Sequence, residues 1–432
     1  MRQIYLLLFG LLCGMPIFGQ VDTTERPAIH SFTVGANLWT RGEWRDGALP
    51  DENGSDEAVF IMESTLLRFS YQYKGLEVRV APKHAGVWGA QGGGAFSLDE
   101  GWFALRGRNG LFLQMGRQKL AYDDERIIGN NDWAMVASRH DVLRTGIEDE
   151  RHKLHLLFAF NQNDANTDGG TYYVDGGQPY KSMQTIWYHF SPNPQLGASL
   201  LFMNTGMQDM VEKGDKSQYQ QLLGAFVDWR PGPLSFQASY YRQSGYNEYQ
   251  LPISAWMMSA EAAWRISRKW NLNTGYYHMS GDDLYYVPME GSFGMARKTR
   301  ICGFNPIFGS HHQFYGAMDF FYVEAYYGGN TPGLQDLHLG VQWNPTAALD
   351  LEAAFHYLAT SVVVEDLSRT LGHELELSAS WQLSRDVKLQ AGYSFMKGTE
   401  TMVRLKRTSD KNHLQWGWLM LSVTPEFFSF VK

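Results

Sequence analysis

The chain has 432 residues, of which 37 are lysine or arginine and 45 are aspartate or glutamate, giving a formal net charge of −8. This balance excludes a nucleic-acid partner, because binding to phosphates needs a basic surface. Charged residues make up only 19% of the chain and aromatic residues 14%, whereas ordinary soluble domains carry about 25% charged residues. The composition therefore favours a protein that exposes apolar surface to a membrane.

The first 20 residues are typical of a secretory signal peptide. Arg2 provides a positive start, residues 4–15 form an apolar run, and Gly19 and Gln20 lead into a polar stretch. The run is shorter than the about 20 residues that a membrane-spanning helix needs, so we expect residues 1–20 to be removed on export. Residues 21–432 then form one domain, in which Cys302 is the one cysteine and no internal disulfide is possible.

Downstream, segments of about 10 residues alternate apolar residues with polar or small ones, which is the signature of barrel strands. The pattern is visible in 256–266 and 350–357. It is clearest in 371–383, where leucines and Trp381 share one face while Glu374 and its polar neighbours share the other. Because the strands of a soluble β-sandwich alternate in the same way, the connections between strands are needed to distinguish a barrel from a sandwich.

The connections alternate between short turns, rich in Gly, Pro, Asn and charged residues, and longer polar stretches. The short turns are at 74–75, 108–110, 148–151, 191–194, 230–233, 267–269, 344–346 and 384–386. The longer stretches are at 45–57, 85–95, 120–133, 162–182, 205–217, 245–252, 280–332, 360–370 and 398–411. Outer-membrane barrels combine short periplasmic turns with long external loops. Eight turns and nine loops predict an all-β fold: a closed antiparallel transmembrane β-barrel of about 18 strands with both termini in the periplasm.

This alternation also places the strand before the turn at 344–346. Residues 316–327 look strand-like, but the turn must be periplasmic and must follow a descending strand. We therefore expect that strand at 334–343 and assign 316–327 to the long loop before it.

One stretch resembles a known family. Residues 111–133, with the sequence LFLQMGRQKLAYDDERIIGNNDW, look like the signature of the alginate-export family of outer-membrane porins. Further similar stretches lie at 139–141, 304–309, 312–316, 319–323 and 333–337. The resemblance implies an 18-stranded outer-membrane pore and, from the founding activity, passage of the anionic polysaccharide alginate through an arginine-lined lumen.

The predicted lumen face carries charges of both signs. The basic candidates for lining the pore are Arg41, Arg68, Arg79, Lys153, Arg265 and Lys388. The acidic candidates are Glu77, Glu261, Asp336, Glu352, Glu374 and Glu376, and His356 shares their face. A pore for a polyuronate is expected to have a strongly positive narrow zone, so six charges against six leave the solute open: small and polar, or anionic, including uronate-containing oligo- or polysaccharide.

The family-like stretch also supplies the sharpest site hypothesis. It combines cations, carboxylates and a tryptophan that could brace a loop folded into the lumen: Arg117, Asp123, Arg126, Asp132, Trp133, Arg139 and Asp141. The alternative is that its guanidinium groups bind carboxylates of a passing solute. We favour the brace, and strict alternation would point Arg117 outward with Leu113 and Met115 unless a bulge intervenes.

The long connection at 280–332 is a candidate constriction loop, with an ordered surface loop as the alternative. Its candidate lining residues are Arg297, Lys298, Arg300, His311 and His312. Adjacent residues of an extended chain point in opposite directions, so we predict no metal site at the histidine pair. We expect no cofactor.

Tryptophans are assigned to interface girdles rather than to a sugar-binding track. The girdle candidates are Trp39, Trp44, Trp102, Trp229, Trp256, Trp270, Trp343, Trp416 and Trp418. A girdle would contact outer-membrane lipid.

The sequence thus predicts a passive channel in the outer membrane of a Gram-negative bacterium. One alternative is a barrel enzyme acting on lipid or peptide, but the chain has no G-x-S-x-G or H-E-x-x-H motif. Glu352 and His356, four residues apart on one strand, are separated by about 13 Å, too far for a proton relay. A structural or adhesion barrel whose loops bind a partner is the other alternative, and periplasmic or biosynthetic partners are not predicted.

Overall fold

The computed structural model describes residues 29–47, 57–107, 109–162, 165, 180–212, 216–282, 299–321, 331–364, 366–406 and 413–432, excluding the side chain of His311. The predicted signal peptide lies outside these residues. Among the described residues, no helix is long and apolar enough to cross a membrane.

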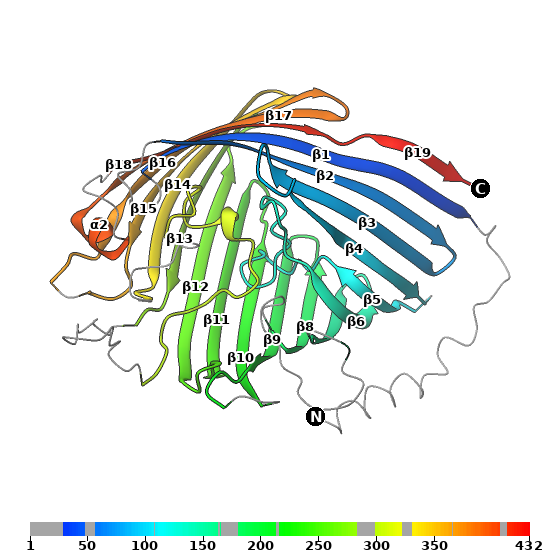
Figure 1. The fold of residues 1–432 in the computed structure, drawn as a ribbon, viewed down its shortest axis with the longest axis horizontal. Coiled ribbons are helices and arrows are strands. Elements are labelled where there is room, and N and C mark those ends of the chain that lie inside the picture. The colour runs from blue at the N-terminus through cyan, green and yellow to red at the C-terminus, as the bar shows by residue number, and fades with distance from the viewer. Residues whose placement is uncertain are drawn as a thin grey trace.

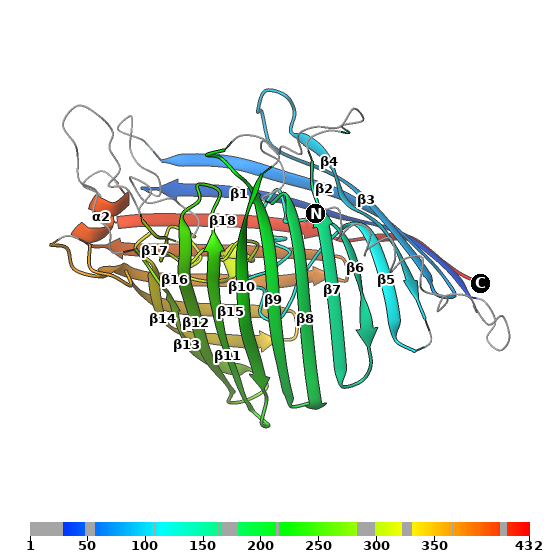
Figure 2. The ribbon, with the colours of Figure 1, turned by 90° about the horizontal axis from the view of Figure 1, so that it is seen from below.

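The described chain forms one closed sheet of antiparallel strands (Figures 1 and 2). The strands are β1 (His30–Asp46), β2 (Ala58–Tyr73), β3 (Leu76–Val87), β4 (Ala95–Arg106), β5 (Leu111–Gln118), β6 (His140–Glu148), β7 (His152–Phe160), β8 (Ser182–Asn193), β9 (Leu196–Gln208), β10 (Ser217–Trp229), β11 (Leu234–Tyr246), β12 (Pro252–Arg265), β13 (Trp270–Met279), β14 (Leu334–Thr346), β15 (Leu349–Ala359), β16 (Thr370–Ser384), β17 (Val387–Gly398), β18 (His413–Val423) and β19 (Glu426–Val431). The two short helices are η2 (His311–Gln313) and α2 (Glu400–Lys406).

The last two strands are halves of one barrel strand, so the barrel has the 18 strands that the connections predict. β18 and β19 both pair with β1 and thereby close the cylinder. Thr424 and Pro425 interrupt them, and the register of β1 shifts between Val34 and Gly35 at that point. Proline has no N–H to donate to a sheet, which explains why the ladder breaks there.

The turns and loops fall close to where the sequence predicts, with shifts of one to six residues at several strand ends. The tight connections after β8 and β14 lie at 194–195 and 347–348, because the strands continue into the residues that we assign to turns. At 230–233 the prediction is confirmed, and Gly232 has a φ of +72°, a conformation that glycine adopts without steric cost. The expected strand at 334–343 is confirmed as β14, and the described part of 316–327 is not a strand.

Alternate residues of each strand face opposite sides of the wall. Large apolar side chains on the outward face are exposed, including Val80, Phe103, Leu200, Leu223, Leu339, Leu377 and Leu419. In β16, Leu375 and Trp381 are outward and about half exposed, whereas Glu374 faces inward and is fully buried. An apolar outer band and a polar interior are what a bilayer requires of a closed barrel.

The girdle hypothesis holds for some of the tryptophans and is wrong for others. Trp229, Trp270 and Trp343 are outward beside short turns, and the rings of Trp270 and Trp343 stack with centroids 5.5 Å apart. Trp416, in contrast, is 1% exposed and donates from Nε1 to the inward Glu43. Three further girdle candidates share the inward face, and these are Trp39, Trp102 and Trp418.

Two segments between strands fold into the cylinder and carry its core (Figures 1 and 2). The first inner segment, residues 119–139, follows β5, and the second inner segment, residues 299–321, precedes β14. Their buried side chains, such as Ile127 and Phe308, form one apolar cluster with inward residues of the wall, such as Met203 and Tyr241. The core of this barrel is therefore a contact between the wall and the infolded segments.

Candidate functional site: the lumen wall and the inner segments

The inward face is identified by its contacts with the inner segments. Arg41 of β1 donates to the carbonyl oxygen of Trp133 in the first inner segment, and Glu374 of β16 accepts from the backbone N–H of Met318 in the second. Residues paired across antiparallel strands share a face, so the strand register extends this assignment around the whole wall.

The pore-lining candidates all lie on this inward face. They are Arg41, Arg68, Glu77, Arg79, Lys153, Glu261, Arg265, Asp336, Glu352, His356, Glu374, Glu376 and Lys388. Their contact with a passing solute stays a prediction. Further charged residues share the face: Glu43, Arg45, Lys83, Asp99, Glu100, Arg106, Arg144, Glu148, Asp228 and Asp350.

The charges on this face are distributed unevenly. On β1–β7, basic residues outnumber acidic ones among the described charged residues of the inward face. Several of these cations are bound to neighbouring carboxylates, as in the Arg41–Glu43 pair at 2.8 Å and the Arg106–Glu77 pair at 3.0 Å. On β10–β16, the inward charged residues are acidic except for Arg265. The lumen wall therefore has a basic side and an acidic side.

The inner segments bind to each other through their backbones. Ile128 and Phe308 form a parallel bridge, with Gly129 N donating to Phe308 O at 2.8 Å. The hydroxyl of Ser310 donates to Glu125 and accepts from the N–H of Asn131. Each inner segment therefore helps to hold the other in place.

Arg126 is the most deeply buried cation of this assembly, at 1% exposed. Its Nε lies 2.9 Å from an oxygen of Asp124, and its Nη2 lies 2.6 Å from Glu261 on β12. The guanidinium group also lies 3.8 Å from the ring centroids of Tyr277 and Phe314. Burial raises the pKa of Asp124, and the adjacent Arg126 opposes that rise. Such contacts favour a brace over a freely available anion site.

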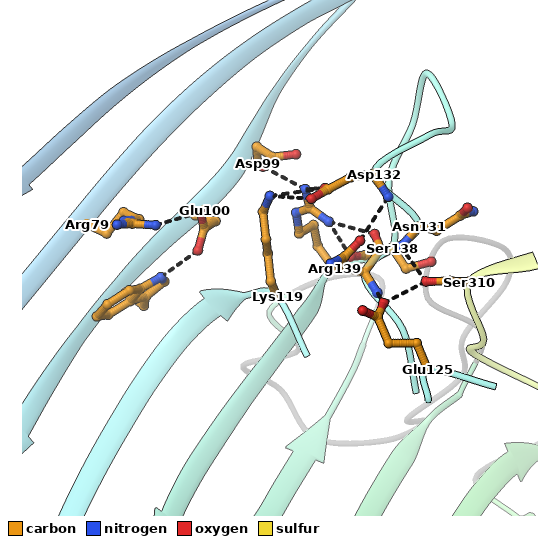
Figure 3. A network of polar contacts seen from close by, with 12 residues as sticks. Arg79, Asp99, Glu100, Lys119, Glu125, Asn131, Asp132, Ser138, Arg139 and Ser310 are labelled. Carbon is orange, nitrogen blue, oxygen red and sulfur yellow. Dashed lines mark hydrogen bonds and ion pairs between the residues drawn. The ribbon is translucent and has the colours of Figure 1, made fainter. Parts of the chain in front are cut away.

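A second charged cluster anchors the other end of the first inner segment (Figure 3). Arg139 lies 2.8 Å from Asp99 on β4 and 2.8 Å from Asp132, and Lys119 lies 2.9 Å from Asp132. Partial burial would raise the pKa of Asp132, but the hydrogen bonds and charges of Lys119 and Arg139 outweigh it and hold that pKa below its ordinary value. Figure 3 shows these side chains converging beside the separate Arg79–Glu100 pair.

Trp133 is packed between a cation and a histidine. The Arg41 guanidinium lies 4.0 Å from its ring centroid, and the His312 ring stacks on it at 4.2 Å with an interplanar angle of 9°. His312 in turn lies 2.8 Å from an oxygen of Asp319. This stack joins β1 to both inner segments.

Two residues of the family-like stretches, Arg117 and Asp141, lie elsewhere than the brace hypothesis places them. Arg117 and Asp141 pair with each other at 2.6 Å on the outward face of β5 and β6, because the strand keeps strict alternation there. Gly116, the residue before Arg117, has a φ of +123°, and a Cβ on it would lie 2.2 Å from the carbonyl oxygen of Gly101, so the strand requires a glycine at this position. Asp123 does brace the first inner segment, but through a tryptophan rather than an arginine: it accepts from Nε1 of Trp187 on the inward face of β8 at 3.0 Å.

The second inner segment is fixed to the acidic side of the wall. Ala317 N donates to Glu376, and Met318 N donates to Glu374 at 2.9 Å. Of the constriction candidates, His312 lies inside the lumen, whereas Arg300 is exposed where the segment meets the outer end of β12. Arg297, Lys298 and the His311 side chain lie outside the described residues.

Sequence reasoning missed several inward groups whose partners only the strand register reveals. His338 faces His356 across β14 and β15, and Asp99 reaches the lumen at a bulge between β3 and β4. The alternation of β14 was readable, and it places His338 on the same face as Asp336.

A closed barrel of 18 strands with an apolar outer band, a polar inner face and segments folded into its lumen is the architecture of an outer-membrane channel. Solved structures agree at the level of the fold. OccAB1 of Acinetobacter baumannii matches with a TM-score of 0.62 and 10% identity over 92% of this chain and 97% of that chain. OccK2 (OpdF) and OccK11 (OpdR) of Pseudomonas aeruginosa match with TM-scores of 0.62 and 0.61, each at 12% identity and 92% of this chain, covering 98% and 96% of those chains.

The family is shown by the sequence itself. The family described as alginate export matches residues 98–360, which is more than half of the chain, and the chain therefore belongs to that family. A search of curated proteins finds no significant match. The resemblance and the fold expected from the sequence are thus confirmed: the protein is an outer-membrane channel for small solutes, and its family consists of channels rather than enzymes.

Proposed function

We propose that this channel conducts small polar solutes of carbohydrate size by passive diffusion. The observation that carries the proposal is the pairing of charges where the inner segments cross the lumen. Arg126 binds Asp124 and Glu261, and Arg139 binds Asp99 and Asp132. Guanidinium groups that are already neutralised by carboxylates leave a weak net field for a polyanion.

A recess at the wall, near the short turns, supports the carbohydrate size class. It has a volume of about 540 Å³ and lies against β11–β14 and the short turn that precedes β11. Its inward lining is rich in amides, with Gln237, Asn271, Asn273 and Gln342 beside Arg265. Amides offer both donors and acceptors, which is the chemistry that sugar hydroxyls need.

An anionic oligosaccharide that contains uronate is the second candidate. Lys153 and Arg265 are exposed on the inward face beside short turns, and no ion pair to either occurs among the described residues. The family is described as alginate export, and this description supplies the chemical class of the candidate.

Solute flux into proteoliposomes tests the proposal. Vesicles that contain the purified channel should swell rapidly in neutral mono- and disaccharides and more slowly in oligouronates of the same size. Protein-free vesicles provide the control. Faster entry of the oligouronate than of the neutral sugar would overturn the proposal in favour of the second candidate.

We also propose that the short turns and both termini are periplasmic and that residues 1–20 are a cleaved signal. The alternation of short and long connections supports this orientation. Single cysteines introduced at Gly232 and at Gly89, in a Cys302→Ser background, provide the test. On intact cells a membrane-impermeant thiol reagent should label only the position at Gly89, and labelling at Gly232 would contradict the orientation.

A further inference from the structure

We propose that the acidic side of the wall contains a binding site for one divalent transition-metal ion, formed by Asp336, His338 and His356. Each of these residues offers one ligand atom, and the three atoms lie within 4.8 Å of one another. All three side chains are buried, with exposures of 0%, 9% and 8%.

The strand register holds the three groups together. His338 of β14 and His356 of β15 are direct partners across the sheet, and their rings lie 5.3 Å apart at 26°. Asp336 precedes His338 by two residues and therefore shares its face. A His₂Asp set is a recurrent three-residue ligand set for Zn²⁺ and related ions.

The spacing fits an ion after small side-chain adjustments. Zn²⁺–ligand bonds of about 2.0–2.1 Å place the ligand atoms of a tetrahedral site about 3.3 Å apart. Nδ1 of His356 already lies 3.0 and 2.9 Å from the two oxygens of Asp336. An ion at this point would replace the proton that joins them, because metal binding releases protons from its ligands.

His338 supplies an independent indication that a ligand belongs here. Its Nδ1 is buried and has no hydrogen-bond partner, although buried polar atoms are normally satisfied. Its other nitrogen, Nε2, lies 3.5 Å from the hydroxyl of Tyr277, which itself donates to Glu261. Nδ1 is therefore the nitrogen that remains for an ion.

Both histidines also have an oxygen near the second ring nitrogen, where metal-bound imidazoles usually find a partner. A ligating histidine commonly donates its second N–H to an oxygen, which fixes the ring and its tautomer. For His356 this oxygen belongs to Glu376, 3.4 Å from Nε2. For His338 it is the Tyr277 hydroxyl.

The surrounding charge favours a cation. Glu374 is fully buried directly opposite His356 and has an oxygen without a partner. The nearby guanidinium of Arg126 is bound to Asp124 and Glu261. Buried carboxylates are costly unless they are paired, and a divalent ion would neutralise this group of acids.

Metal titration of the whole channel tests the site. The protein is purified with a tag that lacks histidine, treated with a chelator and titrated with Zn²⁺ against a chromophoric competitor. We expect one Zn²⁺ per chain and an apparent melting temperature that rises with Zn²⁺. His338→Ala, His356→Ala and Asp336→Asn should each weaken Zn²⁺ binding by at least about tenfold.

His278→Ala is the matched control, because His278 lies on the outward face of the adjacent β13 and its loss should leave Zn²⁺ affinity unchanged. Affinity equal to wild type in all three site variants, or no stoichiometric binding in wild type, would overturn the proposal. If a variant does not fold, the wild-type Co²⁺ complex decides. It should show the intense visible absorption of a four- or five-coordinate site, and the weak spectrum of hydrated Co²⁺ would refute the site.

Discussion

Charged residues on the inward faces of β1–β7 and β10–β16 find their partners in different parts of the molecule. On β1–β7, arginines lie beside carboxylates of the same or a neighbouring strand, as Arg41 lies beside Glu43. On β10–β16, carboxylates such as Glu261, Glu374 and Glu376 each accept from a group of the inner segments. The acidic side therefore depends on the inner segments for its stability, whereas the basic side is largely balanced within the wall.

On the acidic side, hydrogen bonds and ion pairs rather than a disulfide hold the inner segments against the wall. The carboxylates of the acidic side accept from Arg126 and from the backbone of 317–318. Arg126 and Glu374 are almost fully buried, and Glu261 and Glu376 are partly buried, so a group that loses its partner has little water to replace it.

The largest expected effect comes from Arg126→Met. It leaves Asp124 and Glu261 without their cation, and breaking a buried ion pair costs about 3–5 kcal/mol. We expect a loss of that size in the free energy of unfolding, measured by tryptophan fluorescence during urea unfolding in detergent micelles. Arg117→Met is the control, because its partly exposed outward pair with Asp141 is worth at most about 1 kcal/mol. Equal losses in the two variants would contradict the difference between inner and outer pairs.

Glu374→Ala tests the anchor of the second inner segment. It removes the acceptor of the Met318 N–H, and an unsatisfied buried donor costs about 1–3 kcal/mol. We expect faster proteolysis within 299–321 and noisier single-channel currents.

Glu352→Ala is the matched variant for this experiment. It removes a carboxylate from the same side of the wall, and among the described residues that carboxylate holds no backbone N–H of the inner segments. Proteolysis as fast in Glu352→Ala as in Glu374→Ala would show that the anchor is not specific.

A smaller effect is expected for Asp132→Asn, and it should depend on pH. The folded-state pKa of Asp132 is below its ordinary value, so its ionised form stabilises the fold above the unfolded value of about 3.9. That contribution is lost as the pH falls through the lowered folded-state pKa. Because Asp132 is half-exposed, we expect a cost under about 1 kcal/mol at pH 7 that begins to shrink near about pH 3.9 and is lost only below the lowered folded-state pKa. A cost that is constant from pH 7 to pH 3 would contradict the ion-pair explanation.

The smallest effects concern ion selectivity. Lys153→Glu and Glu352→Lys change charges on the basic and the acidic side, and both positions face the lumen. The first should shift the reversal potential in a KCl gradient towards cation preference, and the second towards anion preference, by a few millivolts. Shifts of the same sign would show that one of the two positions does not face the conducting path.

Local patterns were enough to predict the wall. Period-two alternation places Glu374 inward and Leu375 outward, and turn residues such as Gly232 mark where strands reverse. Strict alternation also decides the position of Arg117, which lies outward as that rule indicates. Each of these features depends on residues that are close in sequence.

Contacts inside the lumen could not be read in the same way. Arg126 and Glu261 are 135 residues apart, and Ser310 meets Glu125 across 185 residues. A single sequence gives no signal for such pairs, because their geometry follows from how the loops fold back into the closed barrel. The His338–His356 pair is intermediate: each face was readable, but the register between β14 and β15 was not.

The reversal potential of the wild-type channel in a tenfold KCl gradient tests the central claim most directly. That claim is that the charges where the inner segments cross the lumen are paired with each other and leave little net field. A perfectly selective pore gives about 59 mV at 25 °C, and we predict a value close to zero, together with measurable single-channel conductance. A potential near the full value for anions would contradict the account, because it would require unpaired cations where the structure shows Arg126 and Arg139 bound to carboxylates.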